Sequence, residues 1–167
     1  MTRRILWAVA LMVAAVALQT TLFEDLRPLD AAPALPLLVL IAVGRHLPEQ
    51  PGLLIGFGSG LFLDLLSESP LGLWALVHTI VVFAVLRFRD RSEDDPLVLG
   101  IATFGLTVAA LTLFAVLGTI FGEKTLADAG IVRKIVLPSA FNTVLALGVL
   151  PGVSLLVGAR RRSGWDL

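Results

Sequence analysis

Six apolar segments follow one another along the 167 residues of this chain, with little polar sequence between them. They cover about residues 5–23, 33–46, 51–66, 70–87, 96–121 and 137–157. Hydrophobic residues make up 57% of the chain and charged residues 16%, whereas soluble domains carry about a quarter charged residues. One small globule cannot bury so many apolar runs. The sequence therefore predicts an all-α integral membrane protein that forms a single domain over residues 1–167.

The composition argues against several other classes of protein. The high hydrophobicity excludes intrinsic disorder, and the absence of Cys excludes a disulfide scaffold. Thirteen Lys and Arg balance thirteen Asp and Glu, so no nucleic-acid partner is indicated. The sequence has no phosphate-binding loop, no dinucleotide fingerprint and no metal-spaced cluster, since His46 and His78 are its two histidines. We therefore expect a protein that is not an enzyme and holds no cofactor.

The distribution of positive charge predicts six transmembrane helices with both termini in the cytoplasm. With six spans, nine Lys and Arg lie on the side of the termini and four on the other side, which accounts for all thirteen. The nine are Arg3, Arg4, Arg45, Arg87, Arg89, Arg91, Arg160, Arg161 and Arg162, and the four are Arg27, Lys124, Arg133 and Lys134. The second segment is the doubtful span, because crossing a bilayer takes roughly 20 apolar residues.

The first segment has an alternative interpretation as a secretory signal peptide. Arg3 and Arg4 precede its apolar run, and Ala15-Val16-Ala17 resembles a cleavage site. The run continues to Phe23, which is longer than a typical signal-peptide core and favours a retained span.

Sequence signals also mark where helices begin and end. Asp95-Pro96 and Ser69-Pro70 each place a capping oxygen before a proline, which predicts helix starts. Gly122 and Gly158 stand where helices are expected to stop.

The sixth segment carries two further signals. Pro151 is expected to kink the sixth span. Before that span, Ile131–Ile135 is typical of an amphipathic stretch at the membrane interface.

The third segment carries glycines at every fourth position, Gly52, Gly56 and Gly60. Residues four apart lie on one face of a helix, so these glycines form a stripe that another helix can approach closely. Asp64 is the next member of the series and lies near the outer end of the span. An acid within a membrane span is usually functional, which favours a structural or partner-binding carboxylate over an interfacial one that reaches water.

The short turn Ser67–Pro70 joins the third and fourth segments into an antiparallel hairpin and sets Ser59 and His78 at the same depth. A serine level with a histidine raises the alternative of an intramembrane serine hydrolase. Phe57 stands where such proteases carry a glycine, and no third group is placed to orient the imidazole. A hydrogen bond between hydroxyl and histidine at a helix interface is therefore the favoured interpretation.

Other polar residues fall in the outer half of the predicted spans. Gln19 and Asn142, together with Ser59 and His78, are candidates for lining an outward-facing polar cavity. The same residues are also explained by separate hydrogen bonds between helices. The sequence leaves both interpretations open.

The stretch Gly56–Gly72 resembles the signature of the rod shape-determining protein MreD family. Members of that family typically show Gly-Leu-x-x-Asp-Leu-x-Ser at the end of a glycine-containing helix and Pro-Leu-Gly at the opening of the next. The matching positions here are Gly60, Leu61, Asp64, Leu65, Ser67, Pro70, Leu71 and Gly72. Chain length and the six-helix layout extend the resemblance over the whole chain. One departure is Ala32-Pro33-Ala34, where the family often has Arg-Pro-Asp, so that contact is missing or supplied by Arg27 or Asp30.

The resemblance implies a multi-pass protein of the bacterial inner membrane that belongs to the cell-elongation machinery. Its implied partners are an MreC-like single-span protein and the peptidoglycan synthase complex, which it would help to couple to MreB filaments. We expect one set of residues to form the helix-packing or partner-binding face: Gly52, Gly56, Gly60, Asp64, Ser67, Pro70 and Gly72.

The family layout is also similar to that of the substrate-binding subunits of energy-coupling-factor transporters. This similarity supplies the alternative of a small-solute, vitamin-type transport subunit with an outward-facing cavity. The small residues Ala10 and Ala14 fit the pattern that such subunits present to partners, although the match is close to chance in so Ala-rich a helix. The absence of Tyr speaks against this alternative, because those subunits tend to carry more aromatic ligand contacts.

Overall fold

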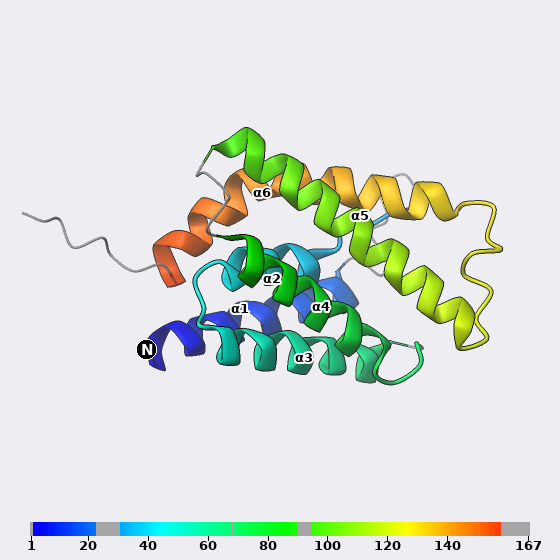
Figure 1. Ribbon diagram of the computed structural model, residues 1–167, viewed down its shortest axis with the longest axis horizontal. Helices are drawn as coiled ribbons and strands as arrows, with labels where there is room; N and C mark the ends of the chain where they lie inside the picture. The colour runs from blue at the N-terminus through cyan, green and yellow to red at the C-terminus, as the bar shows by residue number, and fades with distance from the viewer. Residues whose placement is uncertain (1, 23–30, 68, 90–94, 158–167) are drawn as a thin grey trace, which may run out of the picture.

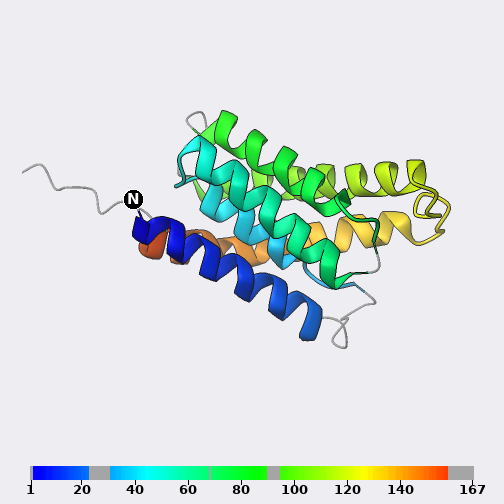
Figure 2. The same ribbon diagram turned by 90° about the horizontal axis from the view of Figure 1, so that it is seen from below.

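The computed structural model of the chain describes residues 2–22, 31–67, 69–89 and 95–157. The six helices formed by these residues are all α-helices, in agreement with the all-α prediction. The six helices are α1 (Thr2–Thr21), α2 (Leu35–Gly44), α3 (Glu49–Leu66), α4 (Leu73–Phe88), α5 (Pro96–Ile120) and α6 (Ile131–Val157). Figure 1 shows α3 with α4 and α5 with α6 as neighbouring pairs, and α2 enclosed between them. Figure 2, turned by 90°, shows α1 alongside α3 on the outside of the bundle.

Three of the described helices are long and apolar enough to cross a membrane by length and composition, namely α1, α5 and α6. Helices α2 and α4 are shorter apolar helices. The outward side chains are also largely apolar, with Leu54, Leu97 and Leu155 exposed by 72%, 70% and 85%. An exposed apolar surface of this kind suits contact with lipid chains rather than water.

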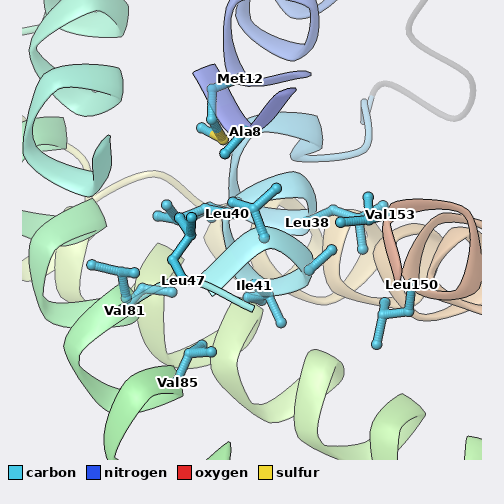
Figure 3. Close-up of a cluster of buried hydrophobic side chains, with 14 of the residues drawn as sticks. Ala8, Met12, Leu38, Leu40, Ile41, Leu47, Val81, Val85, Leu150 and Val153 are labelled. Atoms are coloured by element: carbon cyan, nitrogen blue, oxygen red, sulfur yellow. The ribbon is translucent and has the colours of Figure 1, made fainter. Parts of the chain in front are cut away.

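Helix α2 lies at the centre of the bundle and contacts all five other helices. Its ten residues carry no polar side chain, and eight of them are buried. Figure 3 shows side chains of α2 between Met12 of α1, Val85 of α4 and Leu150 of α6. A helix that is apolar on every side must be buried on every side, which explains this central position. With ten residues α2 is about 15 Å long, roughly half the thickness of a bilayer core.

Two of the expected helix ends are confirmed and one is wrong. Asp95 caps α5 by accepting the N–H of Leu97 at 2.8 Å. Gly122 follows the end of α5 with a φ of 94°, the left-handed conformation that glycine adopts most readily. Ser69-Pro70 does not begin a helix, because α4 starts at Leu73 with Gly72 as its N-cap. The predicted end at Gly158 lies outside the described residues.

The last helix begins earlier than the sequence predicted. Ile131–Ile135 forms the first turns of α6 and is continuous with the rest of that helix. Just before this helix, Asp128 accepts the N–H of Gly130 at 2.7 Å and pairs with Lys134 of α6. The hydrogen bonds from Lys134 and Gly130 lower the pKa of the Asp128 carboxyl. Pro138 and Pro151 both lie inside α6, which changes direction toward its red C-terminal end in Figure 1.

Candidate functional site

The glycine stripe of α3 packs against α4 of the same chain. A Cβ at Gly60 would lie only 2.3 Å from the carbonyl oxygen of Trp74, and a Cβ at Gly56 would lie 2.6 Å from a methyl group of Val82. At Gly52 the nearest atom would be 3.2 Å away. The two helices therefore approach most closely at the Gly60 end, where backbone meets backbone.

The carboxylate of Asp64 reaches from the last turn of α3 to the first turn of α4. Its Oδ1 accepts the N–H of Trp74 at 3.0 Å and the hydroxyl of Ser69 at 3.2 Å. Its Oδ2 accepts the N–H of Gly72 at 3.0 Å and the N–H of Ala75 at 3.1 Å. Because an ionised carboxylate offers about four acceptor positions, these bonds fill its capacity. Asp64 is only 2% exposed, so its charge is buried among these donors.

This arrangement caps α4 from a different helix. The first N–H groups of a helix have no partner within it, and the N-cap Gly72 has no side chain to offer. Asp64 supplies the missing acceptor, and its negative charge lies at the favourable end of the helix dipole. Leu73 donates to the carbonyl of Pro70 at 3.2 Å and Leu76 to that of Gly72 at 2.9 Å, so every N–H of the first turn is satisfied.

The connecting turn brings four of the expected residues together: Asp64, Ser67, Pro70 and Gly72. The hydroxyl groups of Ser67 and Ser69 lie 2.7 Å apart, and the hydroxyl of Ser69 in turn donates to Asp64. Gly72 has a φ of 93°, a backbone conformation that side chains rarely adopt. We call this unit the hairpin cap: Asp64, Ser67, Ser69, Pro70, Gly72 and the N–H groups of Trp74 and Ala75.

Ser59 of α3 and His78 of α4 are in contact close to the point where Gly60 packs against α4. The Oγ of Ser59 lies 3.0 Å from Nδ1 of His78, which agrees with the equal depth expected from the hairpin. Ser59 also donates to the carbonyl of Gly56 at 2.9 Å. The other ring nitrogen of His78, Nε2, is buried and has no hydrogen-bond partner among the described residues. Nothing in the described chain therefore orients the imidazole as the third member of a hydrolase triad would.

A cavity of about 560 Å³, which we call the inter-helix cavity, opens between the helices near the hairpin cap. Its polar wall residues include Gln19 of α1, Ser67 after α3, His78 of α4 and Lys134 of α6. Of the four residues expected to line a polar cavity, Gln19 and His78 do so. Ser59 lines a separate apolar groove between α1 and α3.

Gln19 and Asn142 satisfy backbone groups where α2 begins. Oε1 of Gln19 accepts the N–H of Leu35 at 3.0 Å. Nδ2 of Asn142 donates to the carbonyl of Ala34 at 2.9 Å. This helix start lies inside the bundle, where an unpaired backbone group is costly, and Ala34 has no side-chain oxygen to act as a cap. Two polar side chains from α1 and α6 provide that function.

The sequence inspection missed Thr103 and Thr107 on α5. Both are buried, and Thr107 lies 3.4 Å from Asn142 Nδ2. Each hydroxyl donates to the carbonyl four residues earlier in its own helix, at 2.8 Å. Their spacing of four residues was the available signal, since it places both on one face of the fifth segment.

The described residues contain no group of three or more His, Cys, Asp and Glu side chains that could hold a metal ion.

The model of the family described as rod shape-determining protein MreD matches residues 1–156 of the chain. No curated protein and no solved structure matches the chain.

Proposed function

The chain belongs to the MreD family of rod shape-determining proteins. We propose that it helps to determine the rod shape of the cell by acting as a non-enzymatic scaffold in the bacterial inner membrane. The role in rod shape determination follows from the family. We propose in addition that the protein binds an MreC-like single-span partner. Through this partner it would help to couple MreB filaments to the peptidoglycan synthase complex.

The observation that supports a scaffold is that its buried polar side chains form hydrogen bonds to neighbouring helices. Asp64 has its acceptor positions filled by the turn and by α4. Gln19 and Asn142 hold the start of α2. Each of these side chains fixes one helix to another, which favours a rigid frame over a reaction centre.

The proposed location rests on the apolar surface and on the charge pattern. Exposed Leu54, Leu97 and Leu155 suit a lipid environment. The excess of Lys and Arg on the side of the termini favours both termini in the cytoplasm. In that orientation the hairpin cap faces the outer side of the membrane, where it would lie near a partner that extends outward.

The test is complementation in a rod-shaped bacterium that lacks its own family member. Tagged chain should restore rod shape and co-purify with the MreC-like partner. Ser59→Ala and His78→Gln should leave cell shape nearly normal, because a scaffold needs neither group for chemistry. Loss of rod shape in Ser59→Ala, with the partner still bound, would overturn the scaffold and favour a hydrolase.

Small-solute transport is the second candidate function, and one observation favours it. The inter-helix cavity has the size of a small-molecule site, since such sites span roughly 300–1,000 Å³. Co-purification of an ATPase module in place of cell-wall proteins would support transport over the scaffold.

A further inference from the structure

The second apolar segment enters α2 from a stretch that is not helical. Residues 31–34 have no regular structure, and α2 begins only at Leu35. Ala31 and Pro33 are buried, whereas Ala32 and Ala34 are half-buried. Irregular backbone of this kind occurs at membrane depth only where protein covers it or where it lines a water-filled cavity.

The depth of this stretch follows from its contact with α6. Asn142 donates to the Ala34 carbonyl and lies eleven residues after Ile131, roughly 16 Å along the helix axis. Ala34 therefore lies inside the bundle, well below the loop that joins α5 to α6.

The backbone of Ala32 has no hydrogen-bond partner in the described part of the chain. The bonds near it involve its neighbours, since Gln19 accepts the N–H of Leu35 and Leu38 donates to the carbonyl of Ala34. Neither the N–H nor the carbonyl of Ala32 takes part in a described bond. Backbone polar groups away from bulk water are nearly always paired, so these two groups call for a partner from outside the chain.

Residues 31–34 form one wall of the inter-helix cavity. Polar side chains lie at its mouth: Gln19 in the last turn of α1, Ser67 directly after α3 and Lys134 in the first turn of α6. Figure 1 shows the α3–α4 turn and the α5–α6 loop at the same end of the bundle, so the cavity opens at the end that carries the hairpin cap. The Lys134 side chain is 61% exposed there, as a charged group in contact with water should be.

The chemistry of the walls decides between water and a lipid chain as the occupant. A volume of about 560 Å³ has room for many water molecules, since each occupies roughly 30 Å³ in the liquid. Leu37, Leu63 and Leu111 supply apolar wall that would also suit a lipid chain. A lipid chain, however, would leave both backbone groups of Ala32 unpaired, whereas water can accept from the N–H and donate to the carbonyl.

We propose that the inter-helix cavity is a water-filled inlet, which admits water and small hydrophilic molecules from the hairpin-cap end and excludes lipid chains. Water in the inlet bonds to the backbone of Ala32. The second segment then crosses the membrane as the ten-residue helix α2, continued by a hydrated non-helical stretch. The inference goes beyond the scaffold role and does not depend on it, since it concerns the hydration of one cavity.

Two neighbouring residues of α5 test the inlet at a single depth. Leu111 is half-buried and lines the cavity, whereas Thr112 is exposed on the outer surface of the same helix. Leu111→Cys and Thr112→Cys are purified into nanodiscs, where a reagent reaches both faces of the bilayer and the orientation of the protein plays no part. The probe is the cationic thiol reagent 2-(trimethylammonio)ethyl methanethiosulfonate. Leu111→Cys should react at least about tenfold faster than Thr112→Cys, because the reactive thiolate forms in water and not in lipid.

A second pair of variants uses alanines, so that no space is created at the probe position. Ala34 lines the cavity, and Ala109 lies on the outer surface of α5 within one turn of Thr107, which contacts Asn142 at 3.4 Å. Ala109 is the more exposed of the two, so exposure alone predicts faster reaction of Ala109→Cys. A hydrated cavity within a lipid bilayer should reverse that order, again by about tenfold.

Equal rates within either pair, or faster reaction of the outer-surface cysteine, would overturn the proposal, because the cavity would then be no better hydrated than the lipid-facing surface. Reaction of each variant after unfolding in sodium dodecyl sulfate confirms that its thiol is intact. The alanine pair decides the outcome by itself if Leu111→Cys fails to fold.

Discussion

The carboxylate of Asp64 accepts the backbone N–H of Trp74 at 3.0 Å, ten residues further along the chain and on the next helix. This bond joins the end of α3 to the start of α4 at the point where their backbones are closest. It gives a structural reason for a buried acid at the end of α3: the carboxylate replaces the side-chain cap that Gly72 cannot provide. The hairpin cap is thus the part of the protein where local sequence and tertiary contact are most closely linked.

Two replacements of Asp64 should show whether the stability of the protein depends on the shape of this side chain or on its ability to accept hydrogen bonds. Asp64→Leu leaves buried N–H groups of α4 unpaired, at a cost of about 1–3 kcal/mol for each. Asp64→Asn keeps the shape and one accepting oxygen, so it should be milder. Thermal unfolding in detergent should rank the midpoints as wild type, Asn, then Leu, and recovery of the MreC-like partner should follow the same order. Equal midpoints for Asn and Leu would contradict the capping role.

Gly60 and Gly58 form a matched pair on α3 that tests the close packing. A Cβ at Gly60 would meet the backbone of Trp74 and Ala75 at 2.3–2.5 Å, whereas a Cβ at Gly58 would meet nothing within 4 Å. We expect Gly60→Ala to destabilise the protein by about 1–3 kcal/mol or more, because backbone atoms cannot move aside. Gly58→Ala should be neutral or stabilising by up to about 1 kcal/mol, owing to the higher helix propensity of Ala.

A second pair tests the same face nearer the centre of the bundle. Gly56→Leu should disrupt folding, since even a Cβ at this position approaches Val82. Phe57→Leu should be mild, because Phe57 is 51% exposed on another face. Unfolding midpoints of the two variants are the measurement, and similar values would deny the glycine stripe any special role.

Gly72→Ala tests the turn itself. A side chain at a φ of 93° costs about 1–2 kcal/mol in conformational strain, although a Cβ there would meet no atom within 4 Å. Gly148→Ala is the control, since its Cβ would also meet nothing within 4 Å and Gly148 lies inside α6. We expect a lower unfolding midpoint for Gly72→Ala alone. A matching loss in both variants would point to something other than backbone strain.

Gln19→Leu and Asn142→Leu should each weaken the start of α2. Each removes the partner of a backbone group, Leu35 N–H in one case and the Ala34 carbonyl in the other. An unpaired buried group costs about 1–3 kcal/mol. Amide hydrogen exchange should show faster exchange at the beginning of α2 in both variants. Thr143→Val is the control on α6, because Thr143 donates to the carbonyl of Ser139 in its own helix.

Single cysteines can test the membrane orientation, since the native chain has no Cys to remove. Leu71 is 71% exposed in the turn before α4 and should react with a membrane-impermeant thiol reagent in intact cells after Leu71→Cys. Ser67→Cys, in the same turn, should behave alike. Ser92→Cys, between the fourth and fifth segments, should stay unlabelled until the cells are opened. Labelling of Ser92→Cys in intact cells would contradict the proposed topology, because it would place residue 92 on the outer side of the membrane.

The sequence by itself determined the features that depend on the spacing along one helix or across one short turn. Glycines every fourth residue placed Gly52, Gly56 and Gly60 on one face with Asp64. Counting back from the turn set Ser59 level with His78, and the structure places them 3.0 Å apart. Helical periodicity and a short loop suffice for such predictions, because both are local properties of the chain.

Only the tertiary structure decided where the remaining polar groups bond. Asn142 donates to the carbonyl of Ala34, 108 residues away, and Gln19 accepts from Leu35. The sequence left open whether the two residues line a polar cavity or form separate hydrogen bonds between helices, and it placed the start of the fourth helix at Ser69-Pro70 instead of Leu73. Contacts of this kind depend on how each helix is rotated about its axis and where a buried helix begins. The packing of all six helices together sets those quantities, and no single segment specifies them.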